Sequence, residues 1–297
     1  MTQFTPAILK PTATLLVDDD SFFIENVRAL LPKDVLPSVF CAQELEKINN
    51  CSIFSASGKH IQNIKLNSFS SLKDLFKSGN EPLVSTIVID QSMSPKNGLE
   101  ILKNINNNFV QKILVSNFLK HEDALQALNE GLINAYLCKM EPNFIKNLTR
   151  SIYEAQGRFF YNLSLAIPNF LSQDNPLIEK GAQTIFKTIQ DQYSVKYYEA
   201  NDNLRNFSFY SFNKKEHVNL LIIPQEEVEE VLLSQQADSA PEEVIQLIRN
   251  GKMLPCFKNS AIPDGEEWIG YLRPAQTFQG SKKYIYAIYR DEHHESI

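Results

Sequence analysis

The chain has 297 residues, 43% hydrophobic and 22% charged, with a net charge of −6, a balance typical of folded proteins and not of disordered ones. This length predicts two domains, because a single hydrophobic core rarely grows beyond a few hundred residues. The apolar runs are too short to cross a bilayer, and the four cysteines have neither zinc-site nor disulfide-framework spacing.

The N-terminus lacks the basic start and apolar core of a secretion signal, so we expect a cytoplasmic protein without a membrane partner. The charge is uneven: residues 1–150 hold 15 basic and 15 acidic residues, and residues 151–297 hold 14 and 20. A nucleic-acid-binding module would show a basic patch, because neutralising phosphates drives its affinity. We therefore expect no direct binding of nucleic acid.

Strands and helices alternate through the first half. Apolar runs predict five buried strands, over residues 13–17, 61–66, 84–89, 112–116 and 133–138. Helical spacing predicts the helices between and after them, over residues 20–31, 68–76, from 98, 121–130 and from 142 onward. Gly131 stands where a left-handed helix cap is expected. This alternation predicts an α/β fold with a doubly wound five-stranded parallel sheet.

The interval between the first and third strands is long. Asp19 and Asp90 are 71 positions apart, whereas two ordinary connecting units need about 45 residues. The surplus falls at about residues 34–58, where we expect an insertion packed on the sheet edge.

Polar residues follow four of the predicted strands directly. Asp18, Asp19 and Asp90 follow the first and third strands, and Ser116 and Lys139 follow the fourth and fifth. The carboxyl ends of parallel strands open into one crevice, so these side chains are expected to converge. The alternative for the aspartates is helix capping, which we expect of the next residue, Asp20.

Four segments together resemble the receiver domain of two-component response regulators. They are Val17-Asp18-Asp19-Asp20, residues 90–98, Val115-Ser116-Asn117 and Tyr136-Leu137-Cys138-Lys139. The resemblance covers about residues 12–155 and implies a flavodoxin-like sheet.

This resemblance also implies the roles of the site residues. Asp90 would be the phosphoacceptor. Mg²⁺ would be held directly by Asp19, together with Asp90 and the Ser92 backbone carbonyl, and by Asp18 through a water. Ser116 and Lys139 would bind the phosphoryl group, and Ser116 and Tyr136 would switch conformation with it.

Two departures from the family pattern concern prolines. Lys139 is followed by Met140, where the family has a proline that adopts a cis bond, so the geometry of the lysine is an open question. Pro95 lies one position later than usual, which leaves Ser94 in its place. Neither departure removes a reacting group.

The second half predicts an α+β domain with an antiparallel sheet. Its expected strands are residues 195–199, 207–212, 218–223, 268–272 and 284–289. Its expected helices are residues 176–193, 225–235 and 240–250, the last ended by Gly251. This arrangement is similar to the atypical output half of some quorum-sensing response regulators. We find no motif for catalysis in it, so the only enzyme chemistry expected is that of the receiver.

The sequence therefore predicts a response regulator with a receiver domain at 1–155 and an output domain at 156–297. A sensor histidine kinase or phosphotransfer protein would phosphorylate Asp90, and the protein would form a homodimer. Three alternatives stay open: a receiver-gated enzyme, a small-molecule sensor with a pocket near Tyr197, Phe209 and Trp268, and an adaptor that works without phosphorylation.

Overall fold

The computed structural model describes residues 4–35, 84–94, 97–105, 109–117, 122–167, 170–172, 175–200, 204–212, 216–234, 240–257 and 264–290. Almost all of the insertion predicted at 34–58, together with the strand and helix predicted at 61–66 and 68–76, lies outside these ranges. The chain forms two compact units, each described by itself. We call residues 11–168 the parallel-sheet unit, and residues 1–10 with 169–297 the antiparallel-sheet unit.

The parallel-sheet unit is built on four described strands in the order β2-β3-β4-β5, all parallel. They are β2 (Ala13–Val17), β3 (Val84–Asp90), β4 (Gln111–Ser116) and β5 (Ala135–Cys138). Every residue of β2 and β3 is buried. This is the run of apolar residues expected of strands that are covered on both faces. The predicted parallel α/β fold is confirmed, and the second of its five predicted strands lies outside the described residues.

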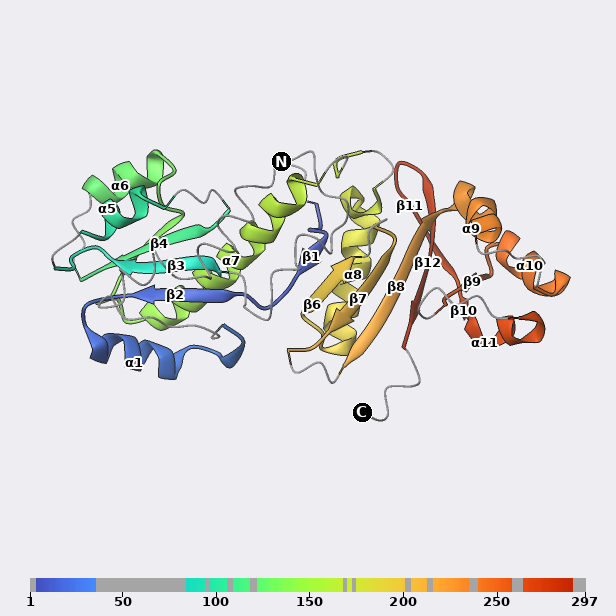
Figure 1. Cartoon of the computed structure of the whole chain (residues 1–297), viewed down its shortest axis with the longest axis horizontal. Coiled ribbons are helices and arrows are strands. Elements are labelled where there is room, and N and C mark those ends of the chain that lie inside the picture. The colour runs from blue at the N-terminus through green and yellow to red at the C-terminus, as the bar shows by residue number, and fades with distance from the viewer. Residues whose placement is uncertain are drawn as a thin grey trace. The chain divides into compact units, whose positions relative to one another are not determined.

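Helices cover both faces of this sheet (Figure 1). They are α1 (Ser21–Leu30), α5 (Gly98–Lys103), α6 (Glu122–Asn129) and α7 (Phe144–Leu165). The helices α1 and α7 share one core with the strands, in which Val27 and Leu148 pack with Leu16, Val88 and Ile113. Figure 1 shows α5 and α6 on the other face. The helix predicted from residue 142 onward is α7. It continues without a break to Leu165, beyond residue 155, where the resemblance to a receiver ends.

The antiparallel-sheet unit has a six-stranded sheet in the order β1-β6-β7-β8-β12-β11. Its strands are β1 (Ile8–Leu9), β6 (Tyr197–Ala200), β7 (Asn206–Tyr210), β8 (His217–Pro224), β11 (Gln276–Gln279) and β12 (Lys283–Tyr289). A separate pair is formed by β9 (Met253–Pro255) and β10 (Leu272–Pro274). The helices are α8 (Lys180–Tyr193), α9 (Val228–Ser234), α10 (Glu242–Arg249) and α11 (Trp268–Tyr271). Short 3₁₀ turns are formed by residues Lys33–Val35, Pro176–Ile178, Gln225–Glu227 and Gly265–Glu267.

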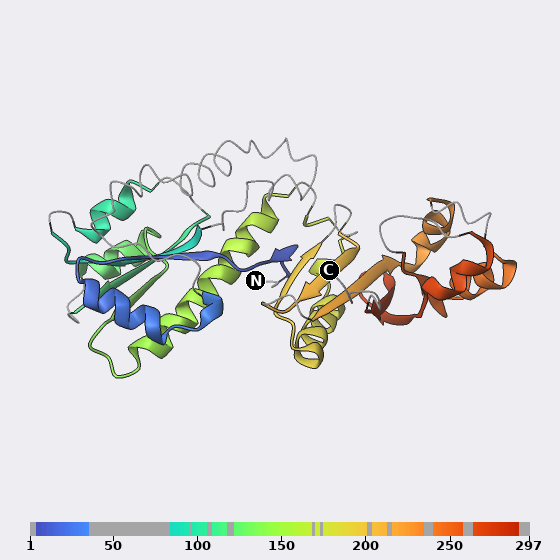
Figure 2. The same cartoon turned by 60° about the horizontal axis from the view of Figure 1, so that its bottom comes forward.

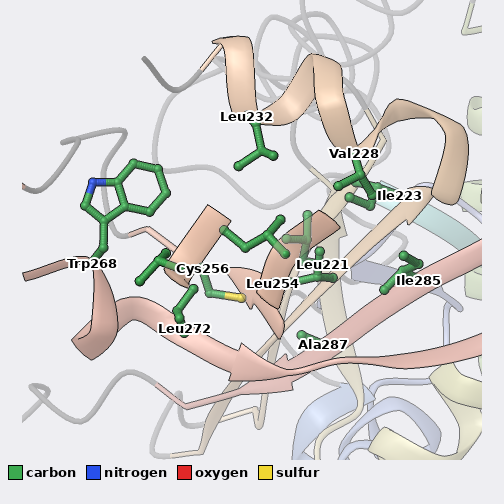
Figure 3. Close-up of a cluster of buried hydrophobic side chains, with 12 residues drawn as sticks. Leu221, Ile223, Val228, Leu232, Leu254, Cys256, Trp268, Leu272, Ile285 and Ala287 are labelled. Atoms are coloured by element: carbon green, nitrogen blue, oxygen red, sulfur yellow. The ribbon is translucent and has the colours of Figure 1, made fainter. Parts of the chain in front are cut away.

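Helices lie on both faces of the antiparallel sheet as well (Figure 2). On one face, the ring of Phe186 in α8 makes edge contacts with Tyr198, Phe207 and Phe209. On the other face, α9, α10 and α11 close a second core over β8 and β12 (Figure 3). This core contains Leu221, Ile223, Val228, Leu232, Val244, Ile248, Leu254, Cys256, Trp268, Leu272, Ile285 and Ala287.

One predicted strand is wrong. Residues 268–271 form the short helix α11, not a strand. Trp268 and Leu272 both enter the same core. A spacing of four residues places two side chains on one face of either a helix or a strand, so the apolar pattern does not distinguish the two. The core decides for the helix.

The N-terminal residues belong to the antiparallel-sheet unit. β1 pairs antiparallel with β6, with Ile8 opposite Glu199, and Lys10 forms an ion pair with Glu199 at 2.5 Å. The ring of Phe4 packs edge-on against Phe170 in the same unit. The observed division at residues 10 and 168 thus differs from the predicted boundary at 155.

Tyr153 of α7 supplies a test of the parallel-sheet unit. Its hydroxyl donates to Asp34 Oδ1 at 2.8 Å, and burial, followed by this carboxylate, raises the pKa of Tyr153 to about 12. An unfolded tyrosine has a pKa of about 10. The stabilisation is therefore complete below about pH 10 and is lost as the pH rises through the folded value.

We expect Tyr153→Phe to reduce the loss of stability between neutral pH and about pH 11, as measured by urea unfolding at both. Equal losses in the variant and the wild type would contradict this assignment.

Candidate functional site

The predicted site residues meet at one edge of the parallel sheet. Val17 lies in register with Ile89, Asp90 with Val115, and Ser116 with Cys138. All four strands therefore end at the same level, so the residues that follow them lie at one edge of the sheet.

Lys139 joins two of these strand ends. Its Nζ donates a hydrogen bond to Asp18 Oδ2 at 2.6 Å and lies 2.6 Å from Asp90 Oδ1. The lysine side chain is 8% exposed, and both carboxylates are buried. Two carboxylates facing one ammonium leave an excess negative charge in a buried place, which favours binding of a cation.

Backbone N–H groups hold the three carboxylates in place. Asp90 Oδ2 accepts from the Ser92 N–H at 2.7 Å, and Asp18 Oδ1 accepts from the Asp20 N–H at 2.9 Å. Asp19 is exposed, and its Oδ2 accepts from the Ser94 N–H at 3.2 Å. Asp19 is thus tied to the loop that carries Ser92. Burial raises the pKa of Asp18, and the hydrogen bonds from Lys139 and the Asp20 N–H oppose this shift.

Asp20 has the capping role predicted for it. Its Oδ1 accepts from the Phe22 and Phe23 N–H groups at 3.0 and 3.1 Å, which starts α1. The first turn of α1 then places the ring of Phe23 at 4.1 Å from Lys139 Nζ. Phe23 also contacts the ring of Phe144, the first residue of α7, with centroids 5.8 Å apart. The ammonium therefore lies between two carboxylates and an aromatic face.

Ser116 is the last residue of β4, and Tyr136 lies within the neighbouring strand β5. Ser116 is buried, and its side chain is hydrogen-bonded to the Tyr136 hydroxyl. Burial raises the pKa of Tyr136, and the hydrogen bond with Ser116 opposes the shift. The two side chains predicted to switch together are thus in contact.

The loop after Lys139 is closed without the family proline. The Lys139 N–H donates to the Ser116 carbonyl at 2.8 Å, and the Glu141 N–H donates to the Cys138 carbonyl at 3.2 Å. These two bonds fix a turn with Lys139 and Met140 at its centre. The Met140 side chain is 75% exposed, so it does not anchor the turn.

The donor atoms of this site suit Mg²⁺. Asp90 Oδ1 is buried and pairs with Lys139 Nζ at 2.6 Å, and a carboxylate oxygen has a further lone pair for a ligand. Within those residues, no group of three His, Cys, Asp or Glu side chains forms a ready-made metal cluster. Mg²⁺ does not require one, because it binds through one or two carboxylates and retains several waters.

The whole chain is similar in structure to the response regulator LqsR of Legionella pneumophila. The match has a TM-score of 0.71 and 24% identity, and it covers 97% of this chain and 91% of that one. The chain has the fold of a response regulator. At this identity the likeness concerns the fold, and it confirms at that level the resemblance drawn from the four motifs.

Two other matches are response-regulator receiver domains. One, from Clostridium thermocellum, is 21% identical over 50% of this chain and 95% of its own, with a TM-score of 0.33. The other, from Methanospirillum hungatei, is 18% identical over 51% and 98%, with a TM-score of 0.36. Such scores add no argument. No protein-family model and no curated protein matches the sequence.

The expected convergence of the site residues is observed. Their chemical roles and the metal-binding role of the Ser92 carbonyl stay predictions.

No helix among the described residues is long and apolar enough to cross a membrane.

The sequence did not predict that Phe23 and Gly98 belong to the site. Phe23 belongs to the helix predicted over residues 20–31, and an apolar residue in a helix does not reveal which loop its first turn faces. Gly98 was expected only as a helix start. Its N–H donates to the Gln91 carbonyl at 3.1 Å, and a Cβ at this position would lie 2.1 Å from the Asp90 carbonyl oxygen.

We expect Gly98→Ala to push the Asp90 backbone out of place and to destabilise the parallel-sheet unit by about 1–3 kcal/mol, as overpacking does. Gly157→Ala in α7 is the matched control, because no atom lies within 4 Å of its added Cβ. That change should stabilise the helix by about 0.5–1 kcal/mol. Urea unfolding measures both, and equal effects would contradict the close approach at Gly98.

Proposed function

We propose that this protein is a phosphorylation-dependent response regulator whose receiver accepts a phosphoryl group on Asp90. The observation that carries the proposal is the contact of Lys139 Nζ with the carboxylates of Asp18 and Asp90, at 2.6 Å each. These three groups come from three different strand ends. Helix capping does not account for this arrangement, because it does not bring in the lysine.

The Asp90 carboxylate would attack the phosphorus of a phosphohistidine on a sensor histidine kinase or phosphotransfer protein. A new O–P bond forms, the P–N bond breaks, and the imidazole leaves with the electron pair and takes up a proton. We assign the attack to Oδ1, which faces the Lys139 ammonium at 2.6 Å, because Oδ2 accepts from the Ser92 N–H. Lys139 would pair with the phosphoryl oxygens as a point charge, and Ser116 would donate a hydrogen bond to them.

Mg²⁺ would neutralise charge on the transferred group. Asp19, Asp90 and the Ser92 carbonyl would hold the ion directly, and Asp18 would hold it through a water. The tie between Asp19 and the Ser94 N–H keeps the loop of Ser92 beside the first strand end, which supports this set. The buried negative charge around Lys139 supports it as well.

The signal would pass through Ser116 and Tyr136. These side chains are hydrogen-bonded to one another. A phosphoryl group that draws Ser116 inward would break that bond and change the position of Tyr136. We propose that this change promotes a homodimer and acts through an output unit that does not bind DNA, in a cytoplasmic protein.

The sensor alternative expects three aromatic side chains to line one pocket, and their positions do not support it. Tyr197, Phe209 and Trp268 are each 0% exposed. Phe209 packs under α8, whereas Trp268 packs with α9–α11 on the opposite face, so the three do not line one pocket. The adaptor alternative is tested by the first experiment below.

With Mg²⁺ and acetyl phosphate, we expect one phosphoryl adduct per chain in the intact mass, with acetate as the leaving group. Asp90→Asn should lose the adduct, because an amide oxygen is a poor nucleophile. Asp123→Asn is the matched control, an exposed aspartate in the same unit that should keep it. Chelation of the metal should abolish the adduct. Absence of any adduct in the wild type would favour the adaptor.

We expect the phosphorylated wild type to sediment as a dimer and Asp90→Asn, treated in the same way, as a monomer. Sedimentation velocity at several concentrations measures both. Equal sedimentation coefficients would exclude phosphorylation-driven dimerisation and leave the phosphoacceptor role intact.

A further inference from the structure

The site contains one contact that the proposed chemistry does not require: the ring of Phe23 over the Lys139 ammonium. The distance from Nζ to the ring centroid is 4.1 Å, well within the range of a cation–π interaction. The ammonium is almost entirely removed from solvent. An aromatic face attracts a cation most strongly where water does not compete.

The position of this ring is fixed from two sides. Asp20 caps the backbone of the turn that carries Phe23. The side chain contacts Phe144, which is buried in the core that joins α1, α7 and the sheet. The ring therefore has a fixed position in the site, and the lysine side chain is the more mobile of the two partners.

In this chain Lys139 requires a contact that fixes the position of its ammonium. The residue after it is the exposed Met140 in place of a proline, and the turn is held by backbone hydrogen bonds. The carboxylates of Asp18 and Asp90 both attract the ammonium at equal distance. The ring of Phe23 is a further contact of the ammonium besides these two carboxylates.

We propose that Phe23 is a positioning residue for Lys139: its aromatic face keeps the ammonium where it meets the phosphoryl group on Asp90. This inference rests on the proposed phosphoryl transfer. It assigns to Phe23 no contact with the reacting atoms.

The contact itself is tested in the full-length protein without metal or phosphate. Protons on the lysine Cε above an aromatic ring are shifted upfield in NMR spectra of protein labelled at lysine Cε. We expect one such signal, assigned by its loss in Lys139→Arg. It should move to the ordinary lysine position in Phe23→Leu and stay upfield in Phe23→Tyr.

The consequence is tested with acetyl phosphate and Mg²⁺. Phe23→Leu should lower the maximal phosphorylation rate about three- to tenfold. The acetyl phosphate concentration that gives half the maximal rate should change little, because Lys139 acts on the transferred group. Phe23→Tyr should keep the rate of the wild type. Phe22→Leu is the matched control: this neighbour is 76% exposed, and its change should leave the rate unaltered.

A fluorinated series at position 23 separates charge from shape if Phe23→Leu folds poorly. Phenylalanine carrying one, two or three fluorine atoms keeps the ring but weakens its negative face, so the rate should fall stepwise. A flat series, or a wild-type rate in Phe23→Leu after loss of the upfield signal, would overturn the positioning role and leave the proposed function standing. A wild type without any adduct would overturn both, while the NMR signal still reports the contact.

Discussion

The buried ion pairs of Lys139 with Asp18 and Asp90 are the contacts on which the site depends. Removing three charges from water is costly unless they are paired and hydrogen-bonded. Here the lysine and nearby backbone N–H groups supply those partners. The carboxylates still outnumber the ammonium, and this excess of negative charge supports the proposed binding of Mg²⁺.

The parallel sheet makes this pairing possible. Four strands that end at one level bring together residues far apart in the chain, and short local devices then aim them. The Ser92 N–H orients Asp90, Asp20 starts α1, and Gly98 lets the backbone pass within contact of the Asp90 carbonyl. Each device acts on the backbone next to a reacting group, so small changes there would be felt at the site.

The antiparallel-sheet unit follows a different principle. Its sheet is covered by α8 on one face and by α9, α10 and α11 on the other, and its aromatic residues fill these two cores. Fold similarity to a response regulator extends over nearly the whole chain. A shared fold does not define an output activity, because activities arise from sites and one fold hosts many of them.

The sequence by itself predicted most of the described strands and helices and the polar residues of the candidate site. Apolar runs marked the strands of the parallel sheet, and Gly131 and Gly251 adopt the left-handed conformation expected of helix ends. The polar residues after the strands named the site, because parallel strand ends must meet. Only the tertiary structure decided what long-range packing controls. Residues 268–271 form a helix, β1 pairs with β6, which comes much later in the chain, and the ring of Phe23 lies over Lys139. Local patterns carry no information on such partners, since these contacts join residues far apart in the chain.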